Sequence, residues 1–196
     1  NLLDDKKVKL YLENLVKTIK NNDLSDDYLN KISKDIKNDI KEDKTKKKLL
    51  IIGEPLVVYK DYLTNNMINE LKENNTIIRQ PLAEVLYMTW KDFSNKRNKK
   101  NKQYISLLKQ AKELIEKTNN ILGNKSPFNE DIDLIDEVLK DKLPMYHGGS
   151  GRYRLGKLFT AKDVDGIILV SSMYENTATI LKIIREKYKE QINIPL

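Results

Sequence analysis

The stretch LLIIG, residues 49–53, is a continuous aliphatic run that ends in glycine. A run this short, and apolar at every position, is typical of a β-strand that is buried on both faces. Strands of this kind occur in parallel sheets, because the crossover helices cover each side of the sheet. The stretch therefore predicts a fold of the α/β class.

The segments that follow continue the alternation of strands and helices. A helix is expected at about 64–73, and the run TIIRQP at 76–81 predicts a second strand, which its proline closes. A strand, a helix and a strand in this order predict a parallel pair with a right-handed crossover. The strongest strand signal is DGIILVS at 165–171, followed by an amphipathic helix at 174–191 and a last expected strand, INIPL, at 192–196. The predicted fold is a small Rossmann-like parallel sheet flanked by helices.

Helical segments precede and interrupt the predicted sheet. Residues 1–48 read as a helical N-terminal extension, a hairpin followed by a charged linker, and its first helix places four aliphatic residues on one face: Val8, Leu12, Leu15 and Ile19. That face is expected to cover another part of the protein. Residues 49–196 form the α/β domain, with a helical insertion at about 82–143. Since a parallel sheet would be expected to continue past the last strand, we expect a fragment of a longer chain.

The composition disfavours several functions. With no cysteine and one histidine, the chain cannot form disulfides, thiolate metal sites, cysteine-held clusters or multi-histidine sites by itself. The net charge is +7, but 31 of the 36 basic residues are lysines, whereas base and phosphate recognition relies on arginine. Nucleic acid is therefore not the expected partner. Without a signal peptide or an apolar run of roughly 18 residues, a cytoplasmic protein without a membrane segment is expected.

Polar side chains are expected at the carboxyl ends of the strands, where open α/β sheets bind their ligands. Glu54 follows the first strand, and Ser172 and Glu175 follow the strand at 165–171. Glu54 suits a catalytic acid or base, although a lone carboxylate at a strand end more commonly has a structural use. Ser172 can equally start the next helix. No catalytic residue is assigned.

The most unusual segment is MYHGGSGRYRLG, residues 145–156, which predicts a glycine-rich loop. Gly148, Gly149 and Gly151 permit positive φ, and Arg152 with Arg154 can clamp a phosphate or a carboxylate. The alternative is a sharp turn whose arginines pair with acidic residues of the chain itself, such as Asp163 or Asp165. Both interpretations remain open from the residues alone.

Three segments carry a shared order of motifs: LLIIGEPLVVYKDYLTNNMINEL at 49–71, YHGGSGRYRLGKLFTAKDVDGIILVSSMYENTATILKII at 146–184, and INIPL at 192–196. In this order they resemble the C-terminal domain of 2-hydroxyacyl-CoA dehydratase activases. These CoA-substrate-specific enzyme activases are related to the dehydratase and benzoyl-CoA reductase subunits. The resemblance implies a Rossmann-like lobe and a ligand-binding set that comprises Glu54, Gly148, Gly149, Gly151, Arg152, Ser172 and Glu175.

The departures from the family pattern concern its redox chemistry. Glu175 stands where relatives have a cysteine that is associated with iron–sulfur ligation, and Ser150 replaces a histidine of the loop. The resemblance implies an iron–sulfur cluster for the family, but the ligands are absent here, so no cofactor or metal is expected within this chain. The ATPase module of the activases is also absent from these residues.

Three functional hypotheses follow from these observations. The first is a cluster-free, dehydratase-activase-like domain that binds a partner subunit or an anionic ligand, an acyl-CoA or a nucleotide phosphate, at the carboxyl ends of the strands. The second is an enzyme for a small acidic substrate that uses Glu54, Arg152 and Glu175. The third is a basic nucleic-acid-binding module that uses residues 91–102.

Overall fold

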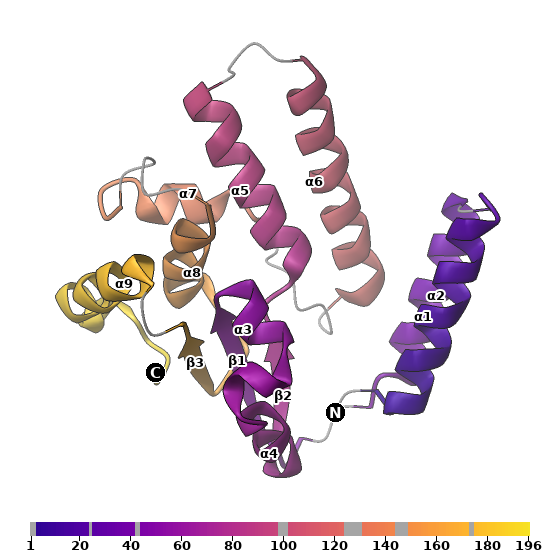
Figure 1. The fold of residues 1–196 in the computed structure, drawn as a ribbon, viewed down its shortest axis with the longest axis horizontal. Coiled ribbons are helices and arrows are strands. Elements are labelled where there is room, and N and C mark those ends of the chain that lie inside the picture. Colours follow the sequence, from indigo (N-terminus) through magenta and orange to yellow (C-terminus); the bar gives the residue numbers. More distant parts are fainter. Residues whose placement is uncertain are drawn as a thin grey trace.

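The computed structural model describes residues 3–23, 25–41, 44–97, 102–123, 131–143, 149–172 and 175–196. These residues form an α/β protein in which helices flank a parallel sheet (Figure 1). The fold class predicted from residues 49–53 is therefore confirmed. No described helix is both long and apolar enough to span a membrane.

Three parallel strands make the sheet, in the order β2-β1-β3: β1 (Lys47–Gly53), β2 (Asn75–Arg79) and β3 (Gly166–Val170). β1 is central, because Leu50 pairs with Ile78 on one side and with Ile167 on the other. The strands predicted at 49–53, 76–81 and 165–171 are thus confirmed. β1 begins slightly earlier than expected, at Lys47.

Both faces of the central strand are buried, as its continuous aliphatic sequence predicts. Leu50 and Ile52 belong to the larger core cluster on one face of the sheet. Ile51 belongs to a smaller cluster with Val58 and Ile68 on the opposite face. The alternation follows from the pleat, which directs successive side chains to opposite sides of a strand.

The connection from β1 to β2 differs from the single helix expected at 64–73. It contains α3 (Pro55–Tyr59), the 3-10 helix η1 (Asp61–Thr64) and α4 (Met67–Asn74). Asn65 and Asn66 separate the last two elements with φ values of 50° and 60°. A right-handed helix cannot continue through left-handed residues, and asparagine tolerates this conformation better than most side chains.

The described part of the insertion at 82–143 contains helices and no strand: α5 (Leu82–Arg97), α6 (Lys102–Leu122) and α7 (Leu134–Leu139). α5 and α7 both pack against α8 (Gly149–Thr160). Gly156 allows the close approach of α7, because a Cβ atom there would lie 2.5 Å from Cγ2 of Ile135. After β3, the chain forms α9 (Asn176–Lys187) and the 3-10 helix η4 (Lys189–Gln191).

Two expectations about local structure are wrong. The predicted loop at 145–156 is a helix from Gly149 onward, and Gly151 does not adopt positive φ. Residues 151–158 are all buried, and this packing outweighs the low helix propensity of glycine. INIPL at 192–196 forms no strand: Pro195 accepts one bond from the Ile167 N–H at 2.9 Å, but proline has no N–H with which to extend a ladder. Residues 145–148, including Gly148, lie outside the described part of the chain.

The N-terminal helices α1 (Asp5–Lys20) and α2 (Asp26–Asp39) lie beside each other, away from the sheet (Figure 1). Ser25 caps α2 by accepting from the Tyr28 N–H at 3.1 Å, and Asp39 accepts hydrogen bonds from Lys7 and Tyr11 of α1. α2 meets the body through α6, where Lys117 pairs with Asp26 at 2.8 Å. Within these two helices no described residue is buried, so the hairpin does not cover the core.

Candidate functional site at the carboxyl edge of the sheet

The carboxyl end of β1 is joined to β2 by a side chain. Gln80 follows β2, and its amide accepts from the Gly53 N–H and donates to the Gly53 carbonyl, both at 2.9 Å. The Gln80 backbone N–H also donates to the Ile51 carbonyl at 2.9 Å. Gln80 therefore extends the ladder between the two strands by one further residue, and it is fully buried.

Glu54 is the first residue after β1, at the point where this ladder ends. Its backbone N–H donates to the Val170 carbonyl at 3.1 Å, so it lies at the junction of β1 and β3. It occupies the N-cap position of α3 without making a side-chain capping bond. Its Oε2 atom is buried, and no described residue donates to it. A buried carboxylate oxygen without a donor is unfavourable, so this position favours a donor or cation supplied by a bound molecule.

Arg154 and Glu175 form a fork-to-fork ion pair at the same edge. Nη1 and Nη2 of Arg154 contact Oε2 and Oε1 of Glu175 at 2.8 and 2.7 Å. Arg154 also donates to Ser150 one helical turn earlier, at 3.1 Å. Glu175 is fixed locally, because its backbone N–H donates to the Ser172 carbonyl at 3.3 Å. The ion pair thus fastens α8 to the segment after β3.

Arg152 lies in a different environment from Arg154. It is buried and pairs with Asp136 at 2.7 Å and with Asp92 at 3.5 Å. Residues two apart on a helix point in nearly opposite directions, so Arg152 turns toward α5 and α7 whereas Arg154 turns toward Glu175. The structure therefore brings Glu54, Ser172 and Glu175 to one edge and leaves Arg152 in the helical packing. Both arginines pair with acids of the chain, as the second interpretation of this segment holds, but with partners other than Asp163 and Asp165.

A second buried cluster lies between α5 and α8. Glu84 Oε2 accepts from the Tyr153 hydroxyl at 2.8 Å and pairs with Lys157 at 3.2 Å. Burial raises the pKa of Tyr153 well above its usual value, and the charge of Glu84 adds to this effect. Burial lowers the pKa of Lys157, and Glu84 opposes the shift. Because all three side chains are nearly inaccessible to solvent, the cluster is suited to holding the two helices together.

A charged network continues along the outer side of the insertion. Asp133 pairs with Lys91 at 2.6 Å and with Lys112 at 2.5 Å, and the Tyr87 hydroxyl donates to it at 3.1 Å. Burial raises the pKa of Asp133, but the two lysines and Tyr87 outweigh burial and lower it to about 2. Lys91, from the basic segment 91–102, thus pairs with carboxylates of its own chain. Residues 98–101 of that segment lie outside the described residues.

The described surface of α5 is apolar on its outer side as well as on its inner side. Val85 and Met88 are buried against the core. On the opposite side lie four large apolar side chains that are 38–45% exposed, which we call the α5 stripe: Leu82, Leu86, Trp90 and Phe93. The solvent side of a surface helix normally carries polar and charged residues instead. The α5 stripe is therefore a surface suited to contact with another molecule.

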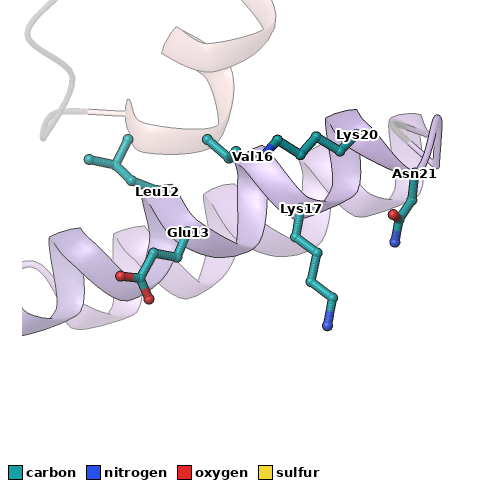
Figure 2. Close-up of a pocket in the computed structure, with 6 residues that line it drawn as sticks. All are labelled: Leu12, Glu13, Val16, Lys17, Lys20 and Asn21. Atoms are coloured by element: carbon teal, nitrogen blue, oxygen red, sulfur yellow. The ribbon is translucent and has the colours of Figure 1, made fainter.

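A shallow groove of about 430 Å³ lies on the N-terminal hairpin (Figure 2). Leu12 and Val16 of α1 point to one side of the helix, and Glu13 and Lys17 point to the other. Leu12 and Ile19, which belong to the face expected to cover the body, are 57% and 53% exposed. The amphipathic pattern of α1 is thus present, but its apolar face contacts little of the described chain.

Sequence reasoning missed two features of this region. It read residues 145–156 as a loop, and without the helical period it could not tell which arginine faces the strand ends. It also treated residues 81–93 simply as part of the helical insertion, although Leu82, Leu86, Trp90 and Phe93 follow a helical spacing that could have revealed an apolar outer face. Within the described ranges, no three acidic or histidine side chains are arranged to hold a metal ion.

The structure defines the chain as an α/β protein with a small parallel sheet and a polar carboxyl edge. No family model, curated protein or solved structure matches it in the comparisons with known proteins.

Proposed function

We propose that this chain is a cluster-free, dehydratase-activase-like domain that binds a partner subunit at the carboxyl ends of its strands. The resemblance of residues 49–71, 146–184 and 192–196 motivates the family, and the parallel sheet is compatible with it. The observation that carries the proposal is the α5 stripe, a row of large apolar side chains on the solvent side of a helix that starts at the end of β2.

α3, which follows β1, contacts the residue that lies just before α5, and it also exposes apolar side chains. The Tyr59 hydroxyl of α3 donates to the Gln80 carbonyl, directly before the start of α5. Tyr59 is 36% exposed, and Leu56 of the same short helix is 62% exposed. Aromatic side chains at the centre of an interface carry much of its binding energy. A partner that covers α5 and α3 would meet Tyr59 and Trp90, and it would come near the unpartnered carboxylate oxygen of Glu54.

The partner-binding interpretation is better supported than the anionic-ligand interpretation. Arg152 and Arg154 were the expected anion-binding groups, and both are buried in ion pairs with acids of the same chain. An acyl-CoA or nucleotide phosphate would have to displace Asp136 or Glu175, leaving a carboxylate unpaired, which is costly. The carboxyl edge also presents Glu54, which repels anions.

Photo-crosslinking from the α5 stripe tests the proposal. Trp90 is replaced by p-benzoyl-phenylalanine in cells that naturally contain the chain, and covalent adducts are identified by mass spectrometry. The expected adduct contains a dehydratase-type or activase-type subunit. The same replacement at Leu114, an apolar residue of α6 that is 53% exposed, serves as the control and should give less of this adduct. Equal labelling from both positions, or an adduct with an unrelated protein, would contradict the proposal.

Binding measurements with the purified partner sharpen the test. Leu86→Ala should weaken binding by about tenfold or more, which corresponds to about 1.4 kcal/mol. Leu114→Ala removes the same atoms from a different helix and should leave the affinity within about twofold. A rise in melting temperature with coenzyme A or a nucleotide, and no effect of Leu86→Ala, would instead favour the anionic ligand.

A further inference from the structure

The outer edge of β3 is a second surface that the proposed function does not use. β3 is an edge strand, because β1 is its sole neighbour in the described sheet. Backbone groups of successive residues point to opposite sides of a strand. The Val170 carbonyl faces β1, where it accepts from Glu54, so Ile167 and Leu169 direct their backbone groups outward. Edges of this kind can pair with another extended chain.

A residue near the C-terminal end of the chain already pairs with part of this edge. The Ile167 N–H donates to the Pro195 carbonyl at 2.9 Å, which places Pro195 beside the first half of β3. No backbone bond to the outward N–H of Leu169 is recorded among the described residues. Among the described residues, Pro195 pairs with the first half of the edge and none pairs with the second half, which we call the open half.

A groove of about 490 Å³ follows the open half of the edge, between β3 and α9. Leu169, Ala178 and Leu196 supply apolar lining, and Ser171 lies where the strand ends. Two cations of α9, Lys182 and Arg185, also line the groove. Arg185 additionally contacts its neighbour Glu186, so Lys182 is the more available of the two cations.

We infer that this groove binds an extended peptide segment of a partner protein, which adds a strand beside β3. The peptide backbone would accept a hydrogen bond from the Leu169 N–H and donate one to the Leu169 carbonyl, as in other cases of strand addition. Side chains that alternate along the peptide would place apolar groups against Leu169 and Ala178. Lys182 and Arg185 select a segment that carries an acidic side chain, because opposite charges favour the correct partner and like charges exclude others.

A second copy of this chain fits the groove less well. Two copies paired edge to edge would bring Lys182 and Arg185 of both copies toward the same junction, and like charges placed together are unfavourable. The Pro195 segment would also meet its own counterpart. These features favour a different, acidic strand as the occupant.

Peptide titration followed by NMR tests the inference on the whole chain. The probes are three acetylated hexapeptides in which valine alternates with glutamate, threonine or lysine. The glutamate peptide should bind most tightly and shift the Leu169 amide resonance. Before peptide is added, the Leu169 amide should exchange with solvent faster than the inward-facing amides of Ile168 and Val170.

Two variants at one position separate strand addition from other binding. Leu169→Pro removes the outward N–H and should abolish the shifts, since proline is tolerated at an edge without disturbing the inner ladder. Leu169→Ala keeps the N–H but loses apolar atoms that contact the peptide, so it should weaken binding much less than Leu169→Pro does. Circular dichroism checks that both variants are folded. If Leu169→Pro is unfolded, hydrogen exchange at the Leu169 amide of the natural sequence, measured with and without peptide, tests strand addition instead.

Charge reversal tests the specificity. Lys182→Glu should lower the affinity for the glutamate peptide by about threefold and raise the affinity for the lysine peptide, as expected for a partly exposed charge pair. The inference is overturned if none of the peptides shifts the Leu169 amide at millimolar concentration, if Leu169→Pro binds like Leu169→Ala, or if the lysine peptide binds best. If the protein forms a concentration-dependent dimer that Leu169→Pro abolishes, the occupant of the groove is a second copy of this chain and not a peptide of another protein.

Discussion

The side-chain amide of Gln80 pairs with both backbone groups of Gly53, 27 residues earlier in the chain. In this arrangement a side chain takes the place of one more residue of β2 and satisfies the end of the central strand. Gly53 has no room for a side chain, because a Cβ atom there would lie 1.9 Å from the Val170 carbonyl oxygen. The carboxyl edge of the sheet is therefore a tightly specified part of the molecule.

Replacement of Gln80 should destabilise the sheet. Gln80→Glu keeps the shape but removes the donor to the Gly53 carbonyl and buries a charge, so the free energy of unfolding should fall by about 2 kcal/mol or more. Urea denaturation measures the change. Gln110→Glu, at an exposed position of α6, is the matched control and should stay within about 0.5 kcal/mol of the natural sequence. Equal effects at both positions would show that the Gln80–Gly53 bonds contribute little.

The Arg154–Glu175 pair should show strong coupling in a double-mutant cycle. Arg154→Met leaves Glu175 without its partner, and breaking a buried ion pair in this way costs about 3–5 kcal/mol. The double variant Arg154→Met with Glu175→Leu should recover a large part of that loss. The exposed Arg185–Glu186 pair serves as the reference, with an expected coupling of about 1 kcal/mol or less. A coupling no larger than the reference would mean that the pair does not fasten α8 to the loop.

Acid should weaken the contact between α5, α6 and the segment before α7. The pKa of Asp133 is lowered to about 2 in the folded protein, against an ordinary value of 3.8. The unfolded state therefore binds the proton more readily, and the stability that Asp133 contributes is present above about pH 4 and is lost as the pH falls toward 2.

Denaturation at pH 4 and at pH 2.5 checks this window. The difference in unfolding free energy between the two values should be smaller for Asp133→Asn than for the natural sequence, because asparagine does not titrate. Asp163→Asn, on the turn before β3, should leave the difference unchanged. An identical pH dependence for all three proteins would contradict the assignment.

Removal of the N-terminal hairpin should leave the sheet folded. No described residue of α1 or α2 is buried, and the contact with the body is made by α2 against α6. A chain that begins at residue 44 should therefore keep a cooperative thermal transition within a few degrees of the full-length value. Circular dichroism and calorimetry provide the measurement. Loss of the transition would show that the hairpin is part of the same folding unit.

Much of the fold follows from short stretches of sequence. The short β-type runs at 49–53, 76–81 and 165–171 predict the three strands, and the continuous aliphatic run at 49–53 also predicts that the central strand is buried on both faces. The sequence also limits the chemistry that these residues can perform, because without cysteine they supply no thiolate ligand and form no disulfide, whatever the fold. At the carboxyl edge, the positions of Glu54, Ser172 and Glu175 follow from strand order alone.

The tertiary structure decides what depends on contacts between distant segments. Residues 149–156 are rich in glycine, which locally favours a turn, yet burial against α5 and α7 makes them helical. That helix in turn sends Arg152 to Asp136 and Arg154 to Glu175, a division that spacing along the chain does not specify. Likewise, the apolar pattern of α5 shows which residues are hydrophobic, but only packing shows that Leu86 and Trp90 remain exposed. Local sequence sets which conformations are favourable, and long-range burial chooses among them.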